Sequence, residues 1–416
     1  MNIHRRVGLG KVALTGTALL TLLTFQYGNR VRAAVGGPVE RDTAAYRVLP
    51  PIESGNLLLF PVVRDTKAGA GSPFLTLDEG LKSGQVEITE AGKVRGLVRP
   101  RPTPQAPDGG IFRPYPEPLH PESHGDQVNT LVLINNSERP LLLLAGEIVT
   151  GGKQDRVIAK DRIVPAGSES INLGVFCIEP GRWTEDSATF GASAKAPSHS
   201  LMVQPSVREK AMASKDQHEV WNSVNGTIDQ MAAVSSPAGQ TGIPGPPPGA
   251  RSNLGTTSYA RAMQNTSVSA KVDEAAAPVM KSREKLLEQL RQEHAVGVVV
   301  AVRGEVVWAD IFSDSDLLAR YWTKLIRSYA AESLLNGDTH SPPTIAEAQH
   351  FLDAPTGGTE TSEGAVGVYR YRELRFGKTE TFVLESLLPG TGYDVHISKM
   401  KLRGLARQVT SPQIYR

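Results

Sequence analysis

The chain has 416 residues, with 45 basic and 43 acidic side chains and a formal net charge of +2. Residues 1–33 contain five basic and no acidic side chains, so the rest of the chain has a net charge of +2 − 5 = −3. A chain this close to neutral lacks the basic surface that binds nucleic acid, and no apolar run after the N-terminus approaches membrane-spanning length. We therefore expect no nucleic-acid partner and no membrane contact beyond the N-terminal segment, whereas the oligomeric state stays open.

Residues 1–33 have the layout of an export signal peptide. A basic start precedes an apolar run from about residue 12 to residue 25, and Val31 and Ala33 supply the small residues of a cleavage site. The apolar run is shorter than the roughly 20 residues of a spanning helix. We expect cleavage after Ala33 and a periplasmic or extracellular protein; the alternative is a membrane tether formed by the uncleaved segment.

The standard catalytic and cofactor motifs are missing from the sequence. Lys153 follows Gly152 as in a phosphate-binding loop, but that register puts Glu147 where the first glycine belongs and Gln154 where the hydroxyl residue belongs. The only cysteine, Cys177, lies in an apolar strand-like run, so we expect an inert buried thiol and no intramolecular disulfide. The sequence predicts no metal site and leaves any cofactor unknown.

Strand patterns dominate the N-terminal half. Residues 56–63 form an apolar strand-like run, a short helix is expected to begin near Thr76, and residues 86–89 return to a strand pattern. Later apolar runs are separated by Asn-Asn-Ser, Gly-Gly and Pro-Ala-Gly-Ser turn signals, which predict an antiparallel meander or sandwich. Residues 100–127 are rich in proline and predict a surface insert.

Helical patterns appear after residue 183. Residues 206–232 predict one helix, residues 234–253 have the Pro/Gly/Ser composition of a linker, and a further helix is expected to begin at Ser282. Residues 295–312 predict a hairpin that turns at Arg303 and Gly304.

A long helix with an apolar stripe is expected from about Asp316 to Leu335, within the run 313–337 that begins with capping residues and ends at Gly337. Because both faces of the preceding hairpin are apolar, we expect this helix to cover one face and the N-terminal β region to cover the other. The predicted fold is therefore α+β: an antiparallel β-rich N-terminal region packed with a C-terminal region that contains the hairpin and the helix. We expect an export signal at 1–33, a β-rich part at 54–183 with its insert at 100–127, a helical segment and linker at 184–281, an α+β part at 282–337 and closing strands at 338–416.

Several phrases, in a fixed order, resemble one protein family. They are "GNLLLFPV", "FLTLDEGLKSGQVEITE", "LVLINNSERPLLLLAGEIVTGGKQDRVIAKDRIVPAGS", "VFCIEPGRW" and "VGVVVAVRGEVVWADIFSDSDLLARYWTKLIRSYAAE". Over roughly residues 54–335 the chain resembles the ARG and Rhodanese-Phosphatase-superfamily-associated Protein domain family. The family name implies association with ADP-ribosylglycohydrolases and rhodanese-type phosphatases, and hence a link to ADP-ribose or related nucleotide chemistry. The apparent export signal is a departure from the family, because a protein with an intracellular role of that kind is not exported.

Two groups of polar residues follow strands of the predicted sheet. The first is Glu147 with residues 151–156, and the second is Glu179 with residues 181–183. If those strands are neighbours, both groups lie at one rim, where glycines permit close ligand approach and the cations grip an anion. Together with the link to nucleotide chemistry that the resemblance implies, such a rim suggests a nucleotide-like or sugar-phosphate-like ligand. The expected ligand-binding residues are Gly151, Gly152, Lys153, Gln154, Asp155, Arg156, Arg182 and Trp183, and the expected carboxylate pair is Glu147 and Glu179.

Three interpretations of these residues stay open. The first is a binding module without catalysis. The second is a hydrolase of an ADP-ribose-like or phosphorylated substrate, in which Glu147 and Glu179 divide the acid and base roles and Lys153, Arg156 and Arg182 hold the anion. The third is purely structural, with the charges paired around a well-made turn. The sequence does not decide whether the chain is an enzyme.

Overall fold

The computed structural model describes residues 31–32, 46–64, 72–90, 129–181, 187, 189–191, 201–235, 254–280, 283–354, 358–391 and 393–403. The expected signal up to residue 30, the proline-rich insert and nearly all of the linker lie outside these residues. So do Arg182, Trp183 and the expected helix cap Ser282.

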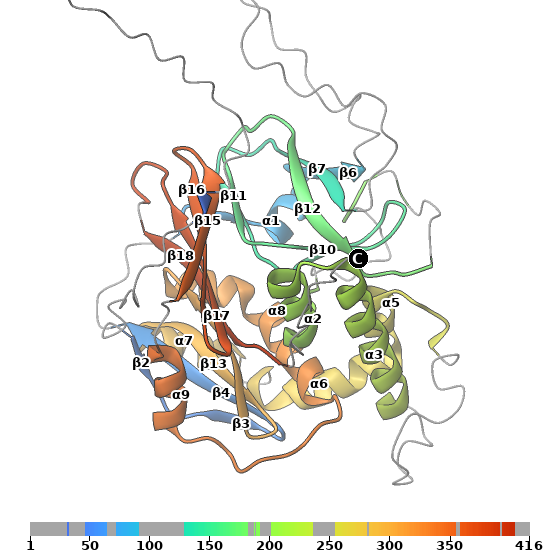
Figure 1. The fold of residues 1–416 in the computed structure, drawn as a ribbon, viewed down its shortest axis with the longest axis vertical. Helices are drawn as coiled ribbons and strands as arrows, with labels where there is room; N and C mark the ends of the chain where they lie inside the picture. The colour runs from blue at the N-terminus through green and yellow to red at the C-terminus, as the bar shows by residue number, and fades with distance from the viewer. Residues whose placement is uncertain are drawn as a thin grey trace, which may run out of the picture.

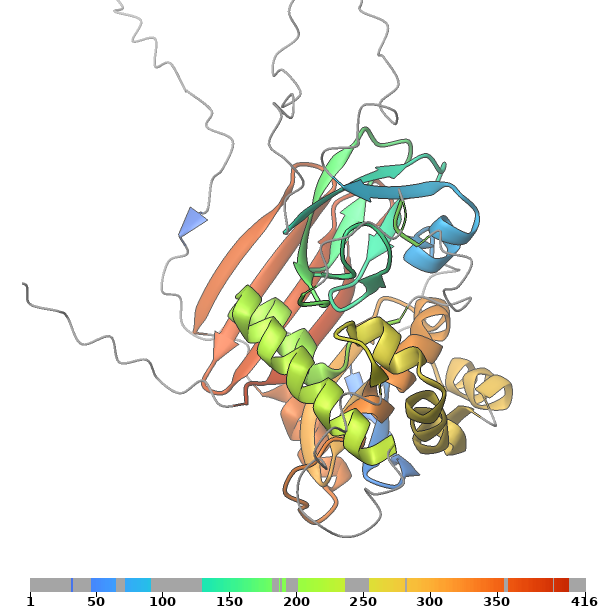
Figure 2. The same ribbon diagram turned by 90° about the vertical axis from the view of Figure 1, so that its right-hand side faces the viewer.

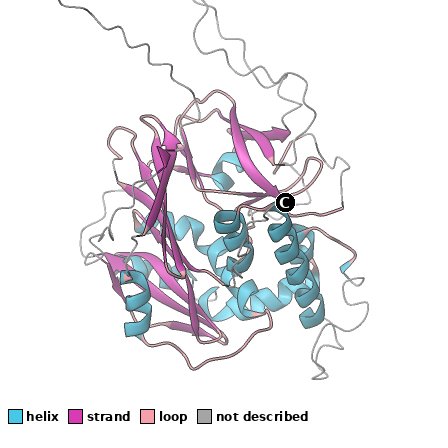
Figure 3. Ribbon diagram, in the orientation of Figure 1, coloured by secondary structure: helices cyan, strands magenta, loops and turns pink. Residues whose placement is uncertain are grey.

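A ten-stranded antiparallel sheet runs through the molecule (Figures 1 and 3). Its centre is the predicted hairpin, which turns at Arg303 and Gly304, both with positive φ (52° and 80°). Strand β4 from the N-terminal half pairs with β13 along its length, so the two halves of the chain share one sheet. In spatial order the strands are β1 (Val31–Arg32), β15 (Thr359–Ala365), β16 (Tyr369–Phe376), β17 (Thr379–Ser386), β18 (Asp394–Lys401), β14 (Glu305–Phe312), β13 (Ala295–Val302), β4 (Leu57–Arg64) and β2 (Tyr46–Val48), and β3 (Ile52–Ser54) also pairs with β4.

Helices cover both faces of this sheet. The predicted long helix, α8 (Ser315–Ser333), begins at its cap Asp314, and its apolar stripe packs with Val298 and Val300 of β13. On the other face Val299 packs with Phe351 of α9 (Ile345–Asp353). The expectation that the N-terminal β region covers this second face is therefore wrong: α9 covers it, and the N-terminal strand β4 extends the sheet edge to edge.

Two smaller sheets make up the N-terminal β-rich region, at the top of Figure 1. β7 pairs directly with β12. Of the strands between them in the sequence, β9 and β10 lie beyond β12 in the same sheet and β8 and β11 belong to the second sheet, so the order departs from a simple meander. The first sheet, in order, is β6 (Val86–Glu90), β7 (Thr130–Asn135), β12 (Ile171–Cys177), β10 (Arg156–Ile158) and β9 (Ile148–Val149), and the second is β11 (Arg162–Val164), β8 (Leu141–Leu143) and β5 (Leu75–Thr76).

The short helix near Thr76 is confirmed as α1 (Leu77–Lys82). The Thr76 hydroxyl accepts from the Glu79 amide, and the Glu79 carboxylate accepts from the Thr76 amide at 3.0 Å, which completes a capping box. This cap holds Asp78 and Glu79 in the first turn of α1, where they form ion pairs with Lys324 and Arg320 of α8.

The single helix predicted over residues 206–232 is interrupted. Lys215 adopts the left-handed conformation (φ 54°), which ends a π-helical turn before the next helix begins. Two further helices, α5 and α6, were not predicted, and α6 packs against α8 (Figure 2). The helices of this region are α2 (Pro205–Glu209), η3 (Lys210–Ser214), α3 (Gln217–Ser235), α5 (Tyr259–Gln264), α6 (Thr266–Met280) and α7 (Arg283–Gln292).

The molecule is thus α+β, as the sequence predicts, with large antiparallel sheets in both halves. Among the described residues, no helix combines the length and apolar character needed to cross a membrane.

Candidate functional site

Antiparallel pairing brings two of the motif segments together. Arg156 at the start of β10 lies opposite Cys177 at the end of β12. Glu179 follows Cys177 by two residues, and the turn at residues 151–155 precedes Arg156, so the turn and Glu179 meet at the same end of the ladder. The predicted proximity of the turn and Glu179 is therefore explained by the register between β10 and β12.

The glycine pair is required by geometry. Gly151 and Gly152 have φ of 121° and 54°, which side chains rarely adopt. A Cβ at Gly152 would lie 2.3 Å from the Phe190 ring and 2.8 Å from Glu90 Oε1. The turn therefore packs directly on the last residue of β6, and Glu90 becomes part of the site.

Side-chain oxygens accept hydrogen bonds from the backbone amides of the turn. Consecutive amides of a turn can form a concave donor site for anions, but here the protein's own oxygens accept from them. Gly151 N donates to Asp155 Oδ1 (3.1 Å), Gly152 N to Ser187 Oγ (3.3 Å), Lys153 N to Glu90 Oε1 (3.0 Å) and Asp155 N to Glu179 Oε2 (3.1 Å).

Further polar contacts surround this turn. Ser258, the N-cap of α5, donates its hydroxyl to Asp155 Oδ2 at 2.6 Å, and Gln154 Nε2 donates to the Glu179 carbonyl at 3.2 Å. The motif-loop cluster is defined as Glu90, Gly151, Gly152, Lys153, Gln154, Asp155, Arg156, Glu179, Ser187 and Ser258.

Two acceptors in the motif-loop cluster lack a hydrogen-bond donor. Glu90 is 1% exposed and Gln154 is 5% exposed. In the part of the chain that the structure describes, Glu90 Oε2 and Gln154 Oε1 have no hydrogen-bond partner. Arg156 Nη2 lies 3.9 Å from the other Glu90 oxygen. Buried polar atoms are almost always paired in folded proteins, so each of these two oxygens can still accept a hydrogen bond.

Glu147 lies in a different polar cluster, against helix α8. Its Oε1 is 2.6 Å from Lys324 Nζ, and its Oε2 accepts from the Leu144 amide at 2.8 Å. Lys324 also reaches Asp78 Oδ2 at 2.8 Å. Burial raises the pKa of Glu147 against the lowering effect of Lys324. Burial opposes the charge on Lys324, but the two carboxylates raise its pKa above its ordinary value.

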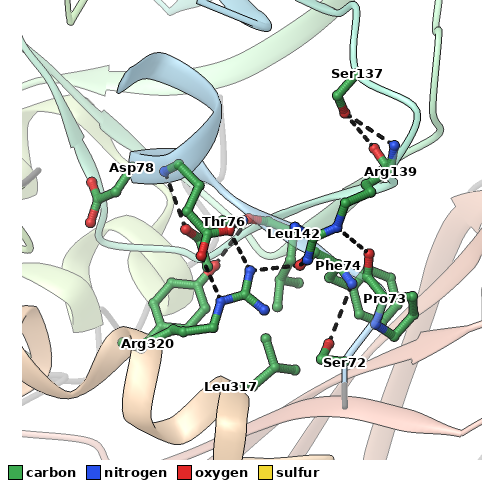
Figure 4. A network of polar contacts seen from close by, with 12 residues as sticks. Ser72, Pro73, Phe74, Thr76, Asp78, Ser137, Arg139, Leu142, Leu317 and Arg320 are labelled. Carbon is green, nitrogen blue, oxygen red and sulfur yellow. Dashed lines mark hydrogen bonds and ion pairs between the residues drawn. The ribbon is translucent and has the colours of Figure 1, made fainter. Parts of the chain in front are cut away.

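Figure 4 shows the outer part of this cluster, which is defined as the α1–α8 cluster and consists of Asp78, Glu79, Arg139, Glu147, Arg320 and Lys324. Arg320 donates to both carboxylate oxygens of Glu79 and also to the Phe74 carbonyl (2.6 Å). Arg139 donates to the same carbonyl at 2.5 Å. These contacts tie the N-terminal strand segment, α1 and α8 together, so the α1–α8 cluster is built as a packing contact between the two halves.

A third polar cluster is fully buried between the large sheet and α2. Asp310 on β14 receives two hydrogen bonds from the Arg208 guanidinium (2.8 and 3.2 Å) and one from the Ser398 hydroxyl (2.7 Å). The Tyr329 hydroxyl also donates to it. His396 Nδ1 lies 2.6 Å from Asp161 Oδ2, and its Nε2 lies 3.3 Å from Asp310 Oδ1. The core ion cluster is defined as Asp161, Arg208, Asp310, Tyr329, His396 and Ser398.

The charges of the core ion cluster support one another. Burial opposes ionisation of Asp310, but Arg208 and His396 hold its pKa well below the usual range. Burial likewise opposes the charge on His396, but Asp161 and Asp310 raise its pKa to about 9. The imidazole is therefore a cation at neutral pH, held between two carboxylates.

The structure separates the two carboxylates that the sequence suggested as a pair. The contacts of Glu147 lead to α8, whereas those of Glu179 lead to the turn at residues 151–155. The residues from Gly151 to Arg156 lie together with Glu179 as expected, but they are mostly buried instead of lining an exposed rim. The roles assigned to these residues stay predictions.

Sequence reasoning missed several members of these clusters. Glu90 and Ser258 are distant in sequence from the Gly-Gly turn, and no local pattern marks them. Asp310 carried a usable signal, because it interrupts the apolar strand β14 and a buried charge requires a partner. In the described segments no three His, Cys, Asp or Glu side chains are placed so that they could hold a metal ion together.

Comparison with known proteins identifies one relationship. A model of the ARG and Rhodanese-Phosphatase-superfamily-associated Protein domain matches residues 45–400. This range contains every member of the three clusters and extends the resemblance seen in the sequence to the C-terminal strands. No curated protein and no solved structure matches the chain.

Proposed function

The chain belongs to the ARG and Rhodanese-Phosphatase-superfamily-associated Protein domain family, and from this membership and the site geometry we propose that it is a binding module. Its ligand is a small polar molecule of the nucleotide or sugar-phosphate-like class, and the motif-loop cluster binds it. The family's name supports a link to ADP-ribosylglycohydrolase and rhodanese-phosphatase systems, and the ligand class follows that link.

One observation carries this proposal. Glu90 Oε2 and Gln154 Oε1 are buried acceptors without a hydrogen-bond partner in the described part of the chain. Each such atom costs about 1–3 kcal/mol in a folded protein. A ligand that donates a hydrogen bond to each oxygen removes that cost, and the gain contributes to its binding free energy. The fold already holds both side chains in position.

The α1–α8 cluster favours binding over hydrolysis. An acid and base pair must face one substrate, but Glu147 is fully buried against Lys324. The raised pKa of Glu147 is the one observation that favours a hydrolase, because a general acid needs a raised pKa. Glu147→Gln and Glu179→Gln variants that turn over a discovered substrate at the full rate would remove the hydrolase alternative.

Thermal-shift screening of the purified chain tests the binding proposal. A ligand that prefers the folded state raises the unfolding temperature by mass action. We expect a shift with nucleotides, sugars or sugar phosphates in the wild-type chain and a smaller shift in Glu90→Gln. The matched control is Glu380→Gln, because Glu380 is also buried with an unpaired Oε2 but lies on β17. A panel that shifts neither protein contradicts the proposal.

We also propose that the chain acts outside the cytoplasm, as its signal-like first 33 residues suggest. The intact mass of the protein recovered from each cell fraction tests this proposal. An exported and processed chain begins after Ala33, whereas a tethered chain retains the full N-terminus. Recovery of the full-length chain from the cytoplasm alone contradicts both forms of export.

A further inference from the structure

The two ends of the ten-stranded sheet are closed in different ways. An edge strand exposes backbone amides and carbonyls that pair with a further strand unless another part of the chain covers them. At the β2 end, the Gln349 side chain of α9 covers such groups: its Oε1 accepts from the Val48 amide at 2.8 Å, and its Nε2 donates to the Tyr46 carbonyl at 3.2 Å. A further strand therefore cannot pair with β2 at these groups.

The opposite end, at β15, is an open edge. β15 pairs with β16 along all seven of its residues without a register shift, and five of the seven residues are exposed. Its sequence, "TETSEGA", contains no lysine and no proline, and these are residues that commonly prevent pairing at an edge. A regular, exposed edge of this kind accepts an additional strand through backbone hydrogen bonds.

The chain's own N-terminal segment occupies part of this edge. β1 is antiparallel to β15, with Val31 opposite Ser362 and Arg32 opposite Thr361, and in the described part of the chain it is the only strand on the outer edge of β15 (Figures 1 and 2). The edge therefore accepts at least one extended segment. Arg32, the last residue of β1, directly precedes Ala33, after which cleavage of the export signal is expected.

Charge adds a smaller preference for the same segment. Residues 28–35 contain two arginines and no acidic side chain, whereas β15 contains Glu360 and Glu363 and no basic side chain. Opposite charges on neighbouring strands favour pairing. Each carboxylate also has a cation of the folded domain nearby, because Lys160 Nζ lies 2.6 Å from Glu363 and Arg372 Nη1 lies 3.9 Å from Glu360. Backbone pairing therefore contributes more to the docking than charge does.

We infer that the outer edge of β15 is a docking site for the N-terminal segment around Val31 and Arg32, and that docking shields this segment from proteases. A protease binds its substrate as an extended segment, so cleavage requires the segment to leave β15 first. Folding before processing therefore slows the expected cleavage after Ala33, and processing frees the edge of β15. The inference concerns a different surface from the motif-loop cluster and does not rest on the proposed ligand.

Disulfide trapping in the full chain tests the docking. Two cysteines form a disulfide only when their Cα atoms come within about 7 Å of each other. We expect the Val31→Cys, Ser362→Cys chain to form this bond under mild oxidation at least about tenfold faster than a Val31→Cys, Val366→Cys control. Ser362 and Val366 are both exposed, but Val366 lies beyond the end of β15, and the native Cys177 is buried. Equal rates for the two chains overturn the docking.

Trypsin digestion tests the shielding. The full chain and a synthetic peptide of residues 26–40 both carry Arg30→Gln, so Arg32 is the only basic residue left between positions 12 and 40. We expect cleavage after Arg32, read from the mass of the product that begins at Ala33, to be about tenfold slower in the chain than in the peptide. Cleavage of the chain at the rate of the peptide overturns the shielding.

The two oxidised double-cysteine chains separate docking from the bulk of the protein. Each carries Arg30→Gln and holds the segment close to the same hairpin, but only the bond at position 362 holds it on the edge of β15. We expect trypsin to cut the chain locked at position 362 more slowly than the chain locked at position 366. Equal rates would overturn the shielding, and none of these measurements depends on a ligand, so the proposed binding function is tested separately by the thermal shift.

Discussion

The core ion cluster and the motif-loop cluster are both buried and both charged, but they differ in balance. The core ion cluster sets two carboxylates against two cations, Arg208 and His396, with formal charge 2 − 2 = 0. The motif-loop cluster sets three carboxylates, on Glu90, Asp155 and Glu179, against two cations, on Lys153 and Arg156, so its formal charge is 2 − 3 = −1. A balanced cluster stabilises the fold, whereas an excess of carboxylates favours an additional donor from a ligand.

The two clusters also differ in the elements that carry them. Asp310 and His396 lie in the middle of paired strands, where neighbouring ladders fix the backbone. The residues of the motif-loop cluster lie on turns and strand ends. Binding residues are commonly found on loops held by a rigid scaffold. The core ion cluster therefore acts as part of the scaffold, and the motif-loop cluster is the part that the scaffold presents.

Removing one charge from the core ion cluster should give the largest effect. Asp310→Asn leaves Arg208 and His396 facing a neutral amide. Because unpairing a buried ion pair is strongly unfavourable, we expect a loss of about 3–5 kcal/mol in the free energy of unfolding. Urea denaturation measures it, with Asp338→Asn as an exposed control that changes stability by less than about 0.5 kcal/mol. Equal midpoints for both variants would mean that the cluster is not structural.

Alkaline pH should weaken the same cluster without a mutation. The pKa of His396 is raised from 6.5 to about 9 in the folded chain. A raised folded pKa contributes stability that is complete below the unfolded pKa and is lost as pH rises through the folded pKa. We expect the free energy of unfolding to fall by on the order of 3 kcal/mol between about pH 6.5 and about pH 9.

The His396→Gln variant provides the control for this pH dependence. Its unfolding free energy should change less over the same pH range, because it lacks the titrating imidazole. The difference between the two curves removes the contributions of other groups that titrate in this window. Parallel curves for the wild type and the variant would show that His396 does not carry the effect.

Local sequence patterns predicted the elements that carry their own signals. The cap at Thr76, the turn at Arg303 and Gly304, and the stripe of α8 each depend on residues a few positions apart. The strand β4 was predicted for the same reason, because its apolar run is continuous. These features form the frame on which both clusters are built.

The clusters themselves could not be assembled from local patterns. The Asp161–His396 contact joins residues 235 positions apart, and the Arg208–Asp310 contact joins residues 102 positions apart. The break at Lys215 was also missed, because its left-handed backbone interrupts a sequence with ordinary helical composition. Such contacts depend on the order of strands in the sheet, which one sequence does not specify.

An added methyl group should test how tightly the motif-loop turn is packed. Gly152→Ala strains a backbone with φ of 54° and places a Cβ 2.3 Å from Phe190. Gly167→Ala has the same backbone strain, with φ of 57°, but no atom within 4 Å. We expect losses of about 2–3 kcal/mol and about 1 kcal/mol in the free energy of unfolding. Equal losses would show that the turn yields to the methyl group.

Cleavage in the linker should have the smallest effect on either cluster. A cut within "GIPGPPPGAR" (residues 242–251) separates a fragment that holds β4, Arg208 and Glu147 from one that holds β13 and α8. The ladder between β4 and β13 and the buried ion pairs of Arg208 with Asp310 and of Glu147 with Lys324 all cross the cut. Since the chain connection adds only loop-closure entropy to these contacts, we expect the nicked fragments to elute together on a sizing column at the position of the intact chain. Separate elution of two folded fragments would mean that the two halves are autonomous, and the core ion cluster would then not hold them together.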